Sequence, residues 1–116
     1  MTPYELLVKA RDVFAERGGA KGELELAGTG QVCALGALNV AASGAVTALW
    51  QWCDVDGTAH YVVDVPGWWA AKKLLDEQVS DHYEHNVVTL NNDLDTTNDD
   101  VLVLFDKAIA GLEEKA

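Results

Sequence analysis

The chain has 116 residues, of which 49% are hydrophobic, and this fits one domain with a buried core rather than a mainly disordered protein. Its formal net charge of −11 argues against direct binding to nucleic acids or to anionic membranes, because such a surface repels phosphate. Two cysteines and a charged N-terminal stretch predict a cytoplasmic protein with neither a disulfide framework nor a signal peptide.

The first predicted element is a helix that begins at Pro3 and ends before the glycine pair at 18–19. Thr2 and Glu5 have the spacing of a capping box, and Pro3 suits the first helical position. The glycine pair at 18–19 ends the helix, since glycine accepts the conformation that a helix C-terminus needs. Apolar residues recur at helical spacing and predict one buried face: Leu6, Leu7, Ala10, Val13 and Phe14.

The middle of the chain is predicted to contain strands and a buried helix. Residues 23–27 alternate polar and apolar side chains, as a half-buried strand does. Residues 33–42 are small and apolar on all sides, which predicts a buried helix. The Asp-Gly step at 56–57 is a favoured hairpin turn, so residues 45–55 and 58–64 are predicted to pair as an antiparallel hairpin.

The C-terminal part is predicted to begin with a helix over residues 68–79, after the Pro-Gly break at 66–67. Residues 87–90 are predicted to be short and extended. A last helix follows Thr97, whose spacing to Asp100 resembles a capping box. The predicted fold class is therefore α+β: a single domain over the whole chain, with three to four helices packed on a small antiparallel β-hairpin or sheet.

Two motifs carry a resemblance to a known family. One is the block Cys-Ala-Leu-Gly-Ala-Leu at 33–38, and the other runs from Asn-Asp at 92–93 through Thr97 and Val101 to Lys-Ala-Ile at 107–109. Together they resemble a family of small uncharacterised proteins from actinobacteria and their bacteriophages. The resemblance spans most of the chain but not the predicted hairpin or the adjacent tryptophans at 68–69. It implies a source and a compartment, and no activity that could be transferred.

Cys33 is the candidate nucleophile of a small hydrolase or transferase. It is predicted to lie at a helix start, where the helix dipole lowers a thiol pKa. His60 and Asp64 follow on a predicted strand, which gives the chain order Cys, His, acid of a thiol triad. However, His60 and Asp64 are far apart along a strand, and a free cysteine is among the most buried residue types. This enzyme is therefore kept as an alternative.

His82 and His85 are the candidate metal ligands. With Asp81 and Glu84 they offer imidazole and carboxylate groups within five residues, a donor set that suits zinc. No further Cys or His lies nearby in sequence to complete a closed shell, so a polar helix end is the preferred interpretation. The acidic run at 92–100 lacks the glycine of a calcium loop. We therefore expect neither a metal nor another cofactor.

Four tryptophans are the candidate binding residues: Trp50, Trp52, Trp68 and Trp69. Each indole N–H needs a partner when buried, and tryptophan is a preferred anchor of protein interfaces. A hairpin packed on a helix accounts for the same residues as core. With the charge of −11, the sequence favours a non-enzymatic acidic module that binds a basic protein. In this interpretation the chain is a phage or accessory protein, and its partner is a host protein. The Cys33 enzyme and an acidic mimic of DNA are the alternatives.

Overall fold

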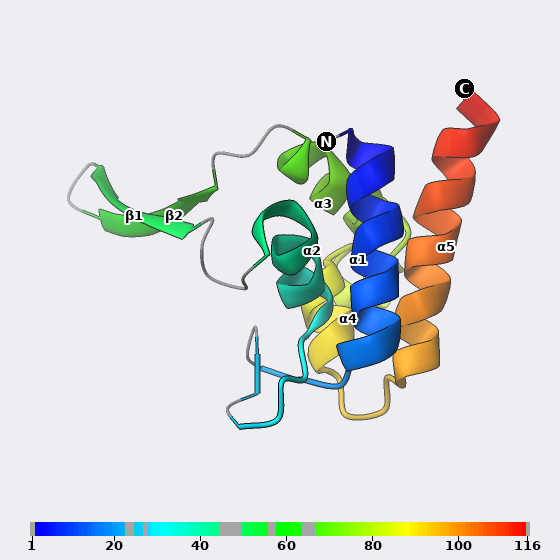
Figure 1. Cartoon of the computed structure of the whole chain (residues 1–116), viewed down its shortest axis with the longest axis horizontal. Coiled ribbons are helices and arrows are strands. Elements are labelled where there is room, and N and C mark those ends of the chain that lie inside the picture. Colours follow the sequence, from blue (N-terminus) through cyan, green and yellow to red (C-terminus); the bar gives the residue numbers. More distant parts are fainter. Residues whose placement is uncertain are drawn as a thin grey trace.

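A computed structural model describes residues 2–22, 25–26, 28–44, 50–55, 58–63 and 67–115; for the strand residues and for 114 and 115 it describes the backbone alone. Figure 1 shows helices lying side by side and a strand pair that projects from one side of them. In chain order the elements are α1 (Pro3–Arg17), α2 (Ala34–Ser43), β1 (Trp50–Val55), β2 (Thr58–Val63), α3 (Trp68–Glu77), the 3₁₀ helix η1 (Asp81–Tyr83), α4 (Val87–Asn92) and α5 (Asn98–Lys115).

Helix α1 has the predicted boundaries, and its start is a complete capping box. The Glu5 backbone N–H donates to Thr2 Oγ1 at 3.1 Å, and the Thr2 N–H donates to Glu5 Oε1 at 3.1 Å. The helix ends at Gly18, whose N–H donates to the Phe14 carbonyl at 2.7 Å. A Cβ at Gly18 would lie 2.5 Å from that carbonyl oxygen, so only glycine fits this position without displacement.

The hydrophobic core is formed by helices. Helix α1 contacts α2, α5 and α3, and the Phe14 and Phe105 rings of α1 and α5 lie 6.2 Å apart. Among the residues whose side chains are described, all members of the core cluster except Val32 and Val79 belong to helices. Within the described part of the chain, the largest fully buried side chains are Trp68, Phe14, Phe105, Leu6, Leu7, Leu38 and Leu75.

The predicted α+β fold class is wrong, because the described chain is helical and its helices pack on one another. Strands β1 and β2 pair antiparallel, with Trp50 opposite Val63 and Trp52 opposite Tyr61, and they are not the layer on which the helices pack. The physical reason is that the apolar stripe of α1 is covered by the apolar helix α2 and by α5, and the stripe of α5 is covered by α1 and α3. No sheet is needed to bury them.

Two other predicted segments differ from the structure. Residues 87–90 are not extended but belong to α4, which begins after Asn86; the Asn86 side chain accepts from the Val88 and Thr89 N–H groups at 2.9 and 3.4 Å. In the segment predicted as a strand over residues 23–27, Glu25 forms an isolated bridge with Val32. Residues 23, 24 and 27 lie outside the described part of the chain.

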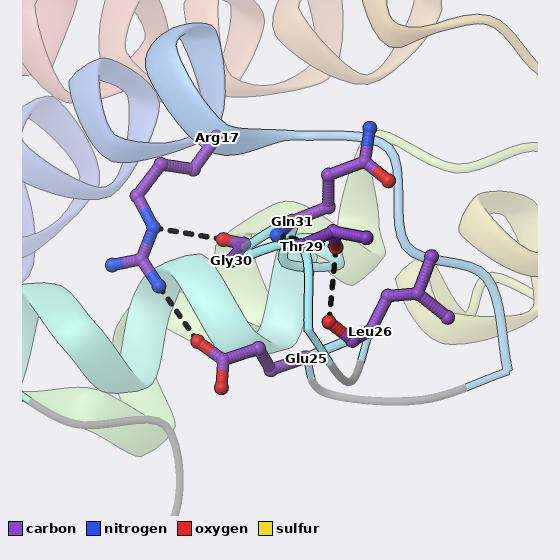
Figure 2. A network of polar contacts seen from close by, with 6 residues as sticks. All are labelled: Arg17, Glu25, Leu26, Thr29, Gly30 and Gln31. Carbon is purple, nitrogen blue, oxygen red and sulfur yellow. Dashed lines mark hydrogen bonds and ion pairs between the residues drawn. The ribbon is translucent and has the colours of Figure 1, made fainter.

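The connection between α1 and α2 is organised by Arg17. Its Nε donates to the Gly30 carbonyl at 2.9 Å, and its Nη2 pairs with Glu25 at 2.7 Å (Figure 2). Within the turn, the Thr29 hydroxyl donates to the Leu26 carbonyl at 2.9 Å. Arg17, the last residue of α1, therefore holds this turn against the end of the helix.

Lys21 ties the same connection to the segment after α4. Its ammonium group donates to the carbonyl oxygens of Asn91, Asp93 and Thr96 at 2.7, 2.7 and 2.9 Å. Three carbonyls around one cation satisfy all three donors of the ammonium. Lys21 thus fixes the path that the chain takes from α4 into α5.

Asn91 joins the same two segments from inside the protein, where only 3% of its surface is exposed. Its Oδ1 accepts from the Ala34 N–H at 3.0 Å, and its Nδ2 donates to the Ala20 carbonyl at 3.0 Å. One side chain therefore satisfies a donor at the start of α2 and an acceptor in the α1–α2 connection. We call Lys21 and Asn91 the interhelix clasp.

Candidate functional site

The adjacent tryptophans at the start of α3 have opposite environments. Trp68 is fully buried, and its Nε1 donates to Oδ1 of the buried Asn39 at 2.8 Å. Trp69 is 55% exposed, and its ring stands edge-on to that of Trp68 with the centroids 4.8 Å apart. Trp68 is thus part of the core and supports the surface position of Trp69.

Asn39 is a residue of this site that sequence reasoning missed. It is fully buried in α2, whose other residues are mostly small and apolar. The signal was available, because a single amide within an apolar helix requires a polar partner. Its partner, the indole of Trp68, lies 29 residues later in the chain, and no periodicity within α2 identifies it.

Trp69 lies at the end of the molecule where the N-terminus of the described chain is found. Figure 1 shows the start of α3, the start of α1 and the end of α5 all at this end of the helices. Gly67 precedes α3 with a positive φ of 86°, a conformation that glycine adopts without strain. The side chains of Trp50 and Trp52, the other predicted binding residues, lie outside the described part of the chain.

Two of the eight carboxylates between residues 76 and 100 stabilise helices and turns directly. The partly buried Asp76 pairs with Lys72 at 2.8 Å and accepts from the Val87 N–H at 2.9 Å, and the exposed Asp100 caps α5 through Thr97. The other carboxylates with exposed side chains are Glu77, Asp81, Glu84, Asp95 and Asp99.

Asp93 is held in its charged form by the loop that follows α4. The Asp95 N–H and the Tyr83 hydroxyl each donate to its carboxylate at 2.9 Å, and these bonds lower the pKa of Asp93. The same hydrogen bond raises the pKa of the Tyr83 phenol. This pair connects η1 to the loop before α5.

Cys33 lies at the start of α2, as predicted, but only 6% of it is exposed. Burial raises the pKa of the Cys33 thiol, although its Sγ accepts from the Gly36 N–H at 3.2 Å. The environment therefore keeps the thiol protonated rather than activating it. The other proposed triad members are not described: His60 has only its backbone described, and Asp64 lies outside the described residues.

His82 and His85 do not lie on one helical face, because the chain turns after η1. Glu84 and His85 have positive φ values of 56° and 50°. The His82 ring lies edge-on against Tyr83, with the centroids 4.7 Å apart, whereas His85 pairs with Asp81. The described residues contain no group of three or more His, Cys, Asp or Glu side chains placed to hold a metal ion.

Comparison with known proteins places the chain in a sequence family. The model of a family of unknown function, DUF6197, matches residues 1–111. No curated protein and no solved structure matches the chain. Among the described residues, no helix has both the length and the apolar character required to cross a bilayer.

Proposed function

The chain belongs to the DUF6197 family, and we propose that it is a non-enzymatic module that binds a basic protein partner, with Trp69 as an anchor. The observation that carries this proposal is the 55% exposure of Trp69 beside a fully buried Trp68. An indole supported by the core loses little conformational freedom on binding, so its contact area contributes efficiently to affinity.

The charge of the chain supports a basic partner. With a net charge of −11 and exposed carboxylates on α3, η1 and α5, the protein attracts positively charged surfaces over several ångströms. Such attraction raises the association rate and weakens as salt screens it. The same surface repels nucleic acids, so the proposed partner is a protein.

The proposal extends to where the protein acts. The resemblance of the block at 33–38 and of the C-terminal helix to proteins of actinobacteria and their phages supports an accessory protein that acts on a host protein. Its setting would be the cytoplasm of the bacterial cell. An accessory role of this kind requires a binding surface and no catalytic group.

The test compares three forms of the protein in affinity capture at low salt, followed by titration of the recovered protein. Trp69→Ala should weaken binding by about 30-fold or more, the effect of losing an interface anchor of about 2 kcal/mol. Leu94→Ala is the matched control, because Leu94 is 89% exposed and belongs to the connection between α4 and α5, which Figure 1 shows at the opposite end of the helices from the start of α3. Equal binding by the wild type and both variants would contradict the proposal.

A further inference from the structure

A surface hollow lies where the start of α1 meets the end of α5. Its volume is about 480 Å³, and its lining residues are Thr2, Pro3, Tyr4, Leu112 and Glu113. The Tyr4 hydroxyl donates to Glu113 Oε1 at 3.0 Å and so bridges the two helices across the hollow. This volume lies within the range of sites that hold small ligands or side chains, about 300–1,000 Å³.

The lining combines an apolar wall with one fixed negative charge. Tyr4 is 40% exposed, Pro3 and Leu112 are partly buried, and Glu113 is the one charged residue of the lining. The hydroxyl of Tyr4 orients the Glu113 carboxylate, and within the described part of the chain Oε2 of Glu113 has no hydrogen bond. Glu113 also lies in the last turns of α5, where the helix dipole adds negative potential.

We propose that this hollow is a subsite for an arginine side chain of the basic partner. An arginine has an apolar stem that matches Leu112 and Pro3, and a planar guanidinium that stacks on a tyrosine ring while it donates to a carboxylate. Lysine provides one compact charge and no flat face, so arginine fits this lining better. The inference rests on the proposed function, because it assigns the partner's chemistry at the same end of the molecule as Trp69.

The test uses the intact protein and the peptide acetyl-Gly-Arg-Gly-amide, with its citrulline counterpart as the uncharged isostere. Binding is followed by NMR shifts of the Tyr4 and Leu112 amides. The arginine peptide should bind at least about fivefold more tightly than the citrulline peptide, because the charge-assisted bond to Glu113 is lost with citrulline. Added salt should reduce this difference.

Two variants and one control locate the binding. Glu113→Gln should weaken the arginine peptide by about fivefold or more, and Tyr4→Phe by about two- to threefold, because the ring stays and the carboxylate loses its orienting bond. Glu16→Gln removes an exposed carboxylate from the last turn of α1 and should leave the affinity unchanged. Unchanged affinity in Glu113→Gln, or equal binding of the citrulline peptide, would overturn the subsite.

The outcomes separate this inference from the proposed function. If capture of a partner depends on Trp69 while the arginine peptide shows no preference over citrulline, the subsite is wrong and the proposed function stands. If the peptide binds as described but no partner depends on Trp69, the proposed function fails, and with it the inference that this subsite serves a partner protein.

Discussion

Replacing Asn91 with alanine should lower the free energy of unfolding by about 2–5 kcal/mol. The side chain is 97% buried and makes two buried hydrogen bonds, to the Ala34 N–H and to the Ala20 carbonyl. Each backbone group that loses its buried partner costs about 1–3 kcal/mol, less whatever an entering water restores. For a domain of this size the loss corresponds to a Tm lower by roughly 10–20 °C.

The assay is urea unfolding followed by circular dichroism, in which the midpoint falls and the slope m stays constant if the compactness of both states is kept. Asn98→Ala is the matched control: Asn98 is exposed and its Nδ2 donates to the Gly18 carbonyl at 3.2 Å, so it should cost about 1 kcal/mol or less. Equal losses in the two variants, or an Asn91→Ala protein as stable as the wild type, would refute the role assigned to the interhelix clasp.

Three further changes test other parts of the structure. Lys21→Met should cost about 1–3 kcal/mol in urea unfolding because three carbonyls lose their cationic donor, whereas Lys73→Met, at an exposed position, should cost about 0.5 kcal/mol or less. In a variant that lacks Cys53, the other cysteine of the chain, iodoacetamide should modify Cys33 at least about tenfold faster in denaturant than in the native state, because burial keeps the native thiol protonated. Equal rates would contradict this. Hydrogen bonds lower the pKa of Asp93 on folding, so they stabilise the protein at pH values above the unfolded-state pKa, and this stabilisation is lost as the pH falls through the folded-state pKa. Tyr83→Phe should therefore raise the pH midpoint of acid unfolding, and an unchanged midpoint would exclude the bond between Tyr83 and Asp93.

Local signals in the sequence predicted the helix ends well because those signals act over a few residues. The capping boxes at Thr2 and Thr97 both form as their spacing indicates. Helix α4 was missed because its six residues are fewer than two turns, too short for an apolar period to show. The capping residue Asn86 was the one available signal.

The arrangement of elements was harder to predict, because it depends on contacts between distant residues. A hairpin was predicted as the layer under the helices, yet the apolar stripe of α1 is covered by α2 and α5. The opposite environments of Trp68 and Trp69 follow from helical periodicity, which places Trp68 on the buried stripe with Ala71 and Leu75, but the polar partner of the Trp68 indole, Asn39, lies 29 residues earlier in the chain. Similarly, the hollow beside Tyr4 forms only when the two ends of the chain meet. Sequence spacing contains none of these distances.

The most direct test of a protein-binding role is photocrosslinking in intact cells from benzoylphenylalanine placed at position 69. We predict a discrete adduct with a basic protein that forms from position 69 and not from position 94, although residue 94 is the more exposed of the two. Adducts of equal yield from both positions, or no adduct from position 69, would contradict it.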